Sequence, residues 1–334
     1  MPAQVTRHLK YADRRTTLLV DGKWTADWQP VQAKDEQGRF IRQVSGFRNW
    51  VTADGQPGPT GEGGYKAEPG RYHLYVALIC PWASRTLIGR ALKGLEDTIS
   101  VSIVEPILTK EGWRFGDYPG ATADTVNDAI YMHSIYTRAD PHYTGRATVP
   151  VLWDKVRQTI VNNESADILR MFTTGFEALA TKSIDLYPQE HRAGIDSFND
   201  YIYPRLNNGV YRAGFATTQA AYEEAFYEVF GCLEEIEQRL EGREFLCGDH
   251  PTESDIRLFV TLVRFDVAYH GIFKCNRRRL ADYANLRAYT RRMLDWPGVA
   301  ATVNIDHIKR GYYSIASLNP TGIVPLGPEL SEVF

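Results

Sequence analysis

A cysteine ends an apolar run and directly precedes a proline in LYVALICPWASRTLIGRALKG, residues 74–94. Helical periodicity starts at Pro81, and proline suits the first helical position because it has no N–H to leave unpaired. Cys80 is therefore predicted at a helix N-terminus, where free N–H groups and the helix dipole favour negative charge. Such a position lowers a thiol pKa from about 8.5 towards 7 or below, which populates the nucleophilic thiolate. The alternative is a buried core cysteine, our interpretation of Cys232 and Cys247.

Cys80 has no second thiol at the spacing that a redox pair needs. A dithiol oxidoreductase carries Cys-x-x-Cys, in which the second thiol resolves the first, but position 83 is alanine. Cys80 is therefore predicted to work alone. Any mixed disulfide that it forms must then be resolved by an external thiol.

The segment ATVPVL, residues 147–152, places a valine before a proline at the start of a strand. In this order of elements we expect a cis bond between Val149 and Pro150, which would turn the backbone N–H and C=O of Val149 outward beside the helix N-terminus. An extended peptide could pair with these groups. The alternative is an ordinary trans proline at a strand start.

The segment NNESADI, residues 162–168, places Glu164 and Ser165 at a turn that opens a helix. A hydroxyl, free backbone N–H groups and a carboxylate converge there, which suits the end of a ligand that carries both a carboxylate and an ammonium group. Taken alone, this segment is only a helix N-cap. Together with Cys80 and Val149, it matches the two ends and the middle of glutathione.

The elements that would position these residues follow from the pattern around them. Short β-rich runs at 71–79 and 98–108 flank a helical segment at 81–97, and two strands at 148–154 and 158–163 form a hairpin before a helix at 164–172. This order, β-α-β and then β-β-α, is that of a thioredoxin-like domain. The connection at 106–147 is too long for an idle loop, so we expect it to help build the site.

After Tyr187 the pattern is almost wholly helical, which predicts an all-α second domain. One apolar stripe recurs at alternating spacings of four and three, and we interpret it as core; it consists of Tyr222, Phe226, Val229, Leu233, Ile236 and Leu240. Thr252 and Asp255 form an N-cap signature before another apolar run. The expected divisions are 1–64 as an extension packed on the body, 65–178 as the thioredoxin-like domain and 179–334 as the helical domain with a C-terminal tail. The alternative for the extension is a flexible leader.

Composition excludes several classes of function. The 334 residues carry a formal net charge of −3, which argues against nucleic acid or an anionic membrane as a partner. The four cysteines are scattered, so neither a disulfide framework nor a metal site is expected, and a reducing compartment fits best. No run reaches the roughly 18 apolar residues that cross a bilayer, and residues 1–17 have no apolar core of a signal peptide, so we expect the cytoplasm.

Several motifs together resemble the glutathione transferase superfamily and, within it, the glutathionyl-hydroquinone reductases of the Xi class. They are CPWA (80–83), GWRF (112–115), TVPVLWD (148–154), NNESADI (162–168), NNGVYRAGFA (207–216), FKCNRRRL (273–280), HIKRGYYSIASLNPTGIVP (307–325) and the aromatic-rich GRFIRQVSGFRNWV (38–51). The similarity covers nearly the whole chain from about Gly38. CPWA and the tail are more specific than a generic transferase match.

The resemblance implies a thioredoxin-like domain followed by an all-helical transferase domain, in a homodimer. Cys80 matches the catalytic cysteine, and the positions that match glutathione-binding residues are Trp113, Val149, Glu164 and Ser165. Tyr211 and Tyr312 look like the tyrosines that face the hydroquinone, with Tyr203 and Tyr313 as near alternatives.

The reaction that the resemblance implies removes glutathione from a glutathionyl-hydroquinone. Direct attack of a thiolate on the thioether sulfur would expel an aryl carbanion, so a general acid must first protonate the ring to its keto tautomer. Tyr211 and Tyr312 are the candidates, and glutathione is a co-substrate with no other cofactor. Two alternatives remain: a general omega-like transferase or thioltransferase that uses the cysteine, and a non-catalytic binding module of the same fold.

Overall fold

The computed structural model describes residues 18–25 and 33–333. A four-stranded mixed sheet forms the first half of the molecule, with β5 (Tyr72–Val76), β6 (Ile99–Ile103), β7 (Val151–Asp154) and β8 (Thr159–Asn162) in the order β6-β5-β7-β8. β5 runs parallel to β6 and antiparallel to β7, and β7 and β8 form an antiparallel hairpin. The antiparallel pairing brings the end of β5 beside the start of β7. The residues that follow β5 therefore lie close to those that precede β7.

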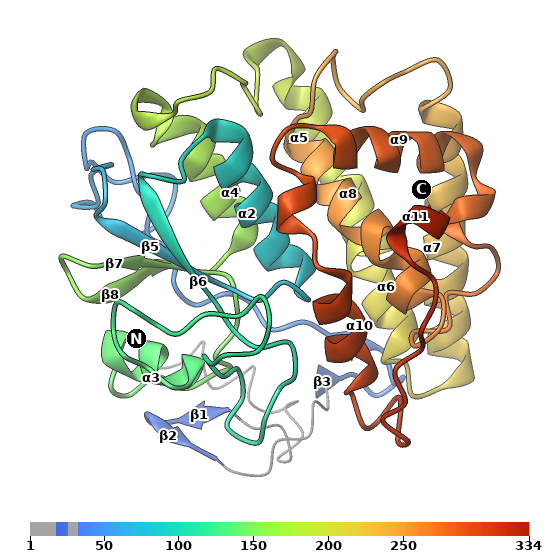
Figure 1. Ribbon diagram of the computed structural model, residues 1–334, viewed down its shortest axis with the longest axis horizontal. Helices are drawn as coiled ribbons and strands as arrows, with labels where there is room; N and C mark the ends of the chain where they lie inside the picture. The colour runs from blue at the N-terminus through green and yellow to red at the C-terminus, as the bar shows by residue number, and fades with distance from the viewer. Residues whose placement is uncertain (1–17, 26–32, 334) are drawn as a thin grey trace.

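Helices cover both faces of this sheet, and every residue of β5 is buried. In Figure 1, α2 (Pro81–Lys93) and α4 (Ser165–Thr174) lie above the sheet, and α3 (Met132–Ala139) lies below it. The α3 helix belongs to the long connection before β7 and was not expected from the sequence. The rest of the order confirms the predicted thioredoxin-like arrangement.

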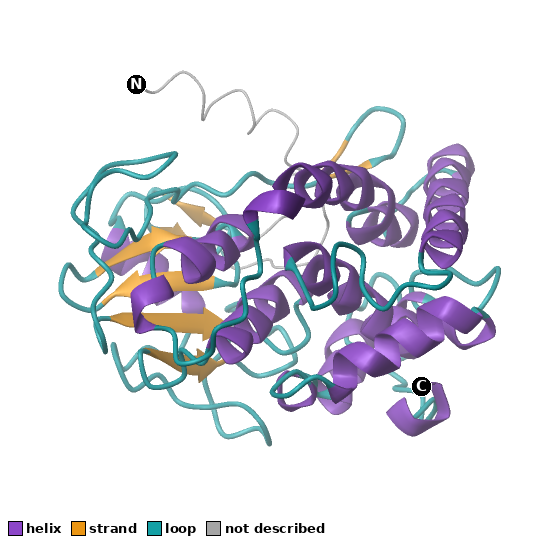
Figure 2. Ribbon diagram, turned by 90° about the horizontal axis from the view of Figure 1, so that it is seen from above, coloured by secondary structure: helices purple, strands orange, loops and turns teal. Residues whose placement is uncertain are grey.

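The second half is helical, and Figure 2 shows it beside the strands rather than around them. Its helices are α5 (Arg192–Ile202), α6 (Gly209–Gly214), α7 (Gln219–Arg239), α8 (Glu253–Arg264), α9 (Ala284–Asp295), α10 (Ile305–Tyr313) and α11 (Leu330–Val333), with π-helical turns at Tyr203–Asn207 and Phe265–Tyr269. The predicted cap of α8 is present, because the backbone N–H and the hydroxyl of Thr252 both donate to the Asp255 carboxylate at 2.8 Å. Four residues of the predicted stripe, Val229, Leu233, Ile236 and Leu240, are buried, as predicted for core. Tyr222 and Phe226 are half-buried and pack against that core.

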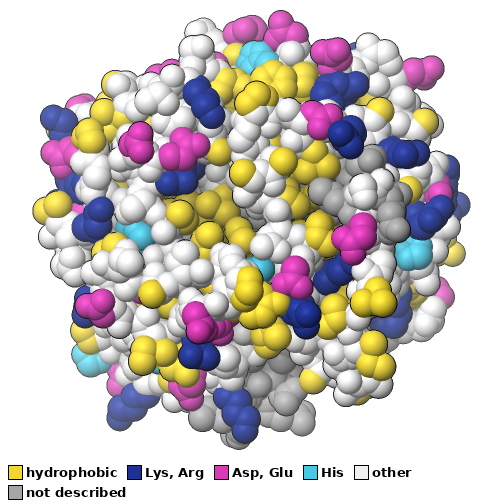
Figure 3. Space-filling model, in the orientation of Figure 1, with side chains coloured by type: hydrophobic (Ala, Val, Ile, Leu, Met, Phe, Trp, Pro, Cys, Tyr) yellow, Lys and Arg dark blue, Asp and Glu magenta, His cyan; other side chains and the backbone are white. Residues whose placement is uncertain are grey.

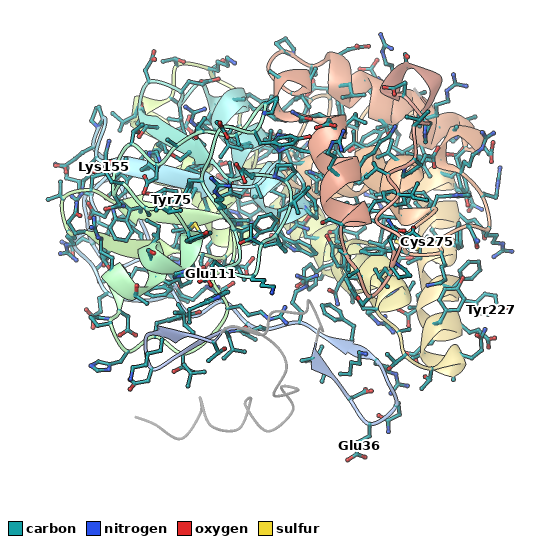
Figure 4. The ribbon with its side chains drawn as sticks, turned by 60° about the horizontal axis from the view of Figure 1, so that its bottom comes forward. Glu36, Tyr75, Glu111, Lys155, Tyr227 and Cys275 are labelled. Carbon is teal, nitrogen blue, oxygen red and sulfur yellow. The ribbon has the colours of Figure 1, made fainter. Side chains whose placement is uncertain are left out.

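The described part of the N-terminal extension contacts both halves. β1 (Leu19–Val20) pairs with β2 (Lys23–Trp24), and Leu19 exchanges two backbone hydrogen bonds of 2.9 Å with Gly145. β3 (Ala33–Lys34) pairs with β4 (Phe40–Ile41) in a hairpin, from which Arg39 bonds Glu224 of α7. In Figure 4 the hairpin, with Glu36 near its tip, lies below the helical half. Residues 1–17 and 26–32 of the predicted extension lie outside the described residues, and the divisions at 64 and 178 stay predictions.

Charged side chains of both signs are interspersed over the face shown in Figure 3. Within the basic run 274–280, the side chains of Arg277, Arg278 and Arg279 are exposed. Among the described helices, none combines the length and the apolar character that a membrane crossing requires.

Candidate active site

A cavity of about 560 Å³ lies where the extension, the sheet half and the helical half meet. All seven residues that the sequence singled out line it, namely Cys80, Trp113, Val149, Glu164, Ser165, Tyr211 and Tyr312. Tyr203 also lines this cavity, whereas Tyr313 is not among its lining residues. The structure therefore brings together groups that are up to 232 residues apart in the chain, counted from Cys80 to Tyr312.

Cys80 is the N-cap of α2, with Pro81 in the first turn, as predicted. Its backbone is extended (φ −76°, ψ 118°), and its carbonyl accepts the first helical hydrogen bond from the N–H of Ser84 at 3.0 Å. The thiol lies 3.6 Å from the carbonyl oxygen of Val149, to which it donates. The peptide bond between Val149 and Pro150 is cis, as predicted. The sulfur therefore lies at the junction of α2 and β7 that the sheet topology creates.

The predicted low pKa of Cys80 is wrong for this structure. Burial raises the pKa of the thiol, because a thiolate loses more hydration energy than a thiol when water is removed. Backbone hydrogen bonds from Ala83 and Trp82 and the charges of Arg264 and Arg42 act in the opposite direction without overcoming it. Cys80 is half-buried and lines the cavity. The sequence indicates the helix N-terminus correctly but does not show how much of the water around the thiol the surrounding elements displace.

Arg264, the last residue of α8, lies behind the cysteine and was missed by the sequence analysis. It is 1% exposed, and it donates to the carbonyls of Leu78 (2.9 Å) and Ile79 (2.8 Å), the two residues before Cys80. It also donates to the carbonyl of Val260 and to the hydroxyl of Ser84. Among the described residues, no carboxylate pairs with this guanidinium. A positive charge is thus fixed beside the loop that carries the nucleophile.

Glu164 is the N-cap of α4, and its carboxylate accepts a hydrogen bond from the backbone N–H of Ala166 at 3.2 Å. The hydroxyl of Ser165 donates to the same carboxylate at 3.4 Å, and a third partner comes from the extension, where the hydroxyl of Ser45 donates to Glu164 at 3.0 Å. Ser165 is 2% exposed, and Arg85 of α2 approaches its hydroxyl at 3.5 Å. This end of the cavity therefore offers a carboxylate, a hydroxyl and a helix N-terminus together, as the sequence predicted.

Trp113 lines the cavity from the long connection before β7. Trp24 of the extension lines it as well, donates its ring N–H to the carbonyl of Lys110 at 3.0 Å and stacks on His133 of α3 at 4.7 Å between ring centroids. This stack fixes β2 against the long connection. The extension thereby forms part of the cavity wall near Trp113.

Tyr211 of α6 and Tyr312 of α10 form a hydroxyl pair with 2.5 Å between their oxygens. A third hydroxyl, that of Tyr269, lies 3.0 Å from Tyr312 and was missed by the sequence analysis. Burial raises the pKa of all three phenols, so all three remain protonated at neutral pH. Of the near alternatives, Tyr203 is 37% exposed and Tyr313 has its hydroxyl close to Gly271. The structure thus distinguishes Tyr312 from its neighbour in sequence.

Two family models match the chain, "Glutathione S-transferase, N-terminal domain" over residues 79–174 and "Glutathione S-transferase, C-terminal domain" over residues 219–292. Glutathionyl-hydroquinone reductase YqjG of Escherichia coli (strain K12) is 54% identical over 93% of this chain and 94% of its own length. Glutathionyl-hydroquinone reductase PcpF of Sphingobium chlorophenolicum is 51% identical over 93% of this chain and 96% of its own.

Solved structures agree with these relatives. The glutathione-bound structure of YqjG superposes with a TM-score of 0.86 and 51% identity, covering 94% of this chain and 96% of that chain. Glutathione transferase Xi from Phanerochaete chrysosporium gives 0.84 and 46%, covering 89% of this chain and 97% of that chain. Together with the cavity and its lone cysteine, these matches show that the chain belongs to the glutathione transferase family and, within it, to the group of Xi-class transferases and glutathionyl-hydroquinone reductases.

Proposed function

We propose that this protein reduces glutathionyl-hydroquinones to hydroquinones at the expense of glutathione, through a mixed disulfide on Cys80. The observation that carries the proposal is the arrangement of one cavity, in which a lone thiol, a hydroxyl pair and a carboxylate-and-hydroxyl end lie together. The other three cysteines, Cys232, Cys247 and Cys275, are buried and do not line this cavity. A second thiol must therefore come from outside the chain.

Glutathione is proposed to lie along the sheet half of the cavity. Its γ-glutamyl ammonium group would pair with Glu164, and the adjacent carboxylate would accept from Ser165 and the N-terminus of α4. The cysteinyl part would pair with the backbone of Val149, which lies within 3.6 Å of the Cys80 sulfur. The aromatic ring would then lie on the side of Tyr211 and Tyr312.

The first chemical step is a proton transfer to the ring. Because Tyr211 and Tyr312 bond each other, one phenol donates to its partner while the partner keeps its own proton for the substrate. Their raised pKa keeps them protonated until the ring carbon accepts that proton. The phenolate that forms shares the second phenol's hydrogen bond and takes up the proton of the ring hydroxyl, which restores the phenol and completes the keto tautomer.

The remaining steps exchange sulfur partners. Cys80 loses its proton and attacks the glutathionyl sulfur, the bond between ring carbon and sulfur breaks, and the electron pair of that bond returns the ring to an enolate. The enolate takes up the proton that Cys80 lost and becomes the hydroquinone. The products are the mixed disulfide and the hydroquinone. A second glutathione thiolate attacks the mixed disulfide at the glutathionyl sulfur, which releases oxidised glutathione and restores the Cys80 thiolate.

The test compares Cys80→Ser with Cys247→Ser, which alters a buried thiol outside the cavity. We expect Cys80→Ser to lose reduction of a glutathionyl-hydroquinone by at least about a hundredfold, because serine cannot form the disulfide. Cys247→Ser should retain the activity and, like the unmodified protein, gain one glutathione in mass at Cys80 after exposure to oxidised glutathione. Full activity in Cys80→Ser contradicts the mechanism. Conjugation without reduction identifies a general transferase, and the absence of any adduct identifies a binding module.

We further propose that the protein acts as a homodimer in the cytoplasm, as the resemblance and the scattered cysteines predict. Sedimentation equilibrium should give twice the mass of 37.9 kDa. A monomer at micromolar concentration contradicts the dimer. Fractionation of cells that express the protein tests its location.

A further inference from the structure

Arg42 of the extension reaches into the aromatic side of the active-site cavity. Its guanidinium carbon lies 3.6 Å from the centre of the Trp82 ring, in the first turn of α2, and 5.0 Å from that of Tyr211. Its Nε donates to the side-chain oxygen of Asn208 at 2.8 Å, which fixes the guanidinium to the helical half. Arg42 thus lines the wall on which the ring of the substrate is proposed to lie.

Within residues 18–25 and 33–333, the charge of Arg42 has no counter-ion. Asn208 is the one hydrogen-bond acceptor that it reaches within the described part of the chain, and its Nη2 is buried without a partner. Stacking on Trp82 satisfies one face of the guanidinium and leaves its in-plane donors for a planar anion. A buried donor without a partner lowers the stability of the fold, so the unpaired Nη2 of Arg42 requires an explanation.

The other charges of the cavity do not provide that anion. Glu164 is the one carboxylate among the lining residues that the structure describes, and it is already bonded to Ser45 and Ala166 at the opposite, α4 end. A second lining arginine, Arg146, carries the same sign as Arg42. The charge of Arg42 also opposes the effect of burial on the pKa of both Cys80 and Tyr211, so it acts on the reacting centre.

We propose that Arg42 is a specificity-determining residue that selects aromatic rings bearing a negatively charged substituent, such as a ring carboxylate. This inference rests on the proposed function, because it assigns the ring to the Trp82 and Tyr211 wall. The anion lies in the plane of the guanidinium and accepts from its free Nη donors. Stacking on Trp82 fixes the orientation of that plane. The glutathionyl part is bound elsewhere, so the preference depends on the ring alone.

The experiment uses two glutathionyl-hydroquinones that differ in one group, a ring carboxylate or the neutral carboxamide of the same shape. Their dissociation constants are measured by calorimetry on Cys80→Ala protein, which cannot turn them over, and their kcat/KM values on protein with the native cysteine. We expect the carboxylate to be preferred about tenfold in both measurements, the size of one charge-assisted hydrogen bond. Arg42→Met should reduce both ratios to about one, and Arg42→Lys should keep part of the preference.

The matched control is Arg39→Met, which removes an arginine from the same hairpin that pairs with Glu224 outside the cavity. It should leave both ratios unchanged even if it loosens the extension. Equal binding of the two ligands to Arg42-containing protein, or an equal loss for both in Arg42→Met, overturns the inference. A binding preference without turnover overturns the proposed reaction and leaves the role of Arg42 standing.

Discussion

Two opposing effects act on the pKa of the Cys80 thiol. Withdrawal of water raises the pKa of the thiol, while N–H groups of α2 and two arginines lower it. The fully buried Arg264 belongs to α8 of the helical half, yet it donates to the two carbonyls directly before the nucleophile. The reactivity of this thiol therefore depends on a residue that no local motif around Cys80 indicates.

Removal of the charge at position 264 should make Cys80 less reactive. In Arg264→Met the pKa of Cys80 rises further, so the rate of alkylation by iodoacetamide at pH 7 falls by about tenfold, while the rate at a pH where the thiol is fully ionised changes little. Arg264→Lys keeps the positive charge and should recover most of the alkylation rate, even though it loses the planar guanidinium group. A rate profile against pH that is unchanged in Arg264→Met contradicts the electrostatic role, and circular dichroism verifies that each variant is folded.

The tyrosine pair gives a prediction that separates two neighbours in sequence. Tyr312→Phe removes the hydroxyl that bonds both Tyr211 and Tyr269, so kcat for reduction of a glutathionyl-hydroquinone should fall by about a hundredfold. Tyr313→Phe is the matched control, because Tyr313 does not line the cavity, and it should retain nearly full activity. An equal effect of the two substitutions contradicts the assignment.

At the scale of elements, the segment from β4 to Ser45 is the least predictable part of the site. It crosses the cavity from Asn208 of the helical half, which accepts from Arg42, to Glu164 of α4, which accepts from Ser45. The sequence predicted only that the extension, which contains this segment, packs on the body. Its charged and polar residues acquire a role through contacts more than a hundred residues away, and no local periodicity records such contacts.

Loss of the Ser45 hydroxyl should weaken glutathione binding without changing the chemistry. Ser45→Ala removes one hydrogen bond that orients Glu164, which costs about 1 kcal/mol and raises the dissociation constant of glutathione about fivefold. Calorimetric titration with glutathione measures this change. The kcat of reduction at saturating substrate should stay within about twofold, and a large loss of kcat would assign Ser45 a different role.

The elements that the sequence predicted correctly have local determinants. Pro81 starts α2, Thr252 and Asp255 start α8, and the cis bond at Pro150 opens β7, each because of residues within a few positions. The α3 helix was missed because it lies in a connection rich in Gly, Asp and aromatic residues. Arg264 and Tyr269 were missed for another reason, since their partners are brought near only by the packing of α8 and α10.

At the scale of the whole molecule, the two halves are joined by buried charges as well as by apolar packing. Arg170 of α4 donates to the Glu253 carboxylate of α8 from Nε at 2.7 Å and from Nη2 at 2.8 Å, and Glu253 is fully buried. Arg264 makes a second link from α8 to the loop after β5. These links predict that the halves unfold together.

Neutralisation of Glu253 tests this coupling. Glu253→Gln leaves Arg170 partly buried with Asp196 as its remaining carboxylate partner, so the free energy of unfolding should fall by about 3 kcal/mol. Denaturation followed by fluorescence and by circular dichroism should give one coincident transition in both proteins. Two separate transitions in the unmodified protein would contradict the coupling.

The link between Arg264 and the carbonyls of Leu78 and Ile79 has a consequence for how the protein is made. The ribosome releases Cys80 long before it reaches Arg264, Tyr269 and Tyr312, so a nascent chain carries its nucleophile without the counter-charge and without the proton donors. A chain halted at that stage lacks the Arg264 charge and the tyrosine hydroxyls. The full set of reacting groups is therefore assembled only when translation has supplied the helical half and that half has docked.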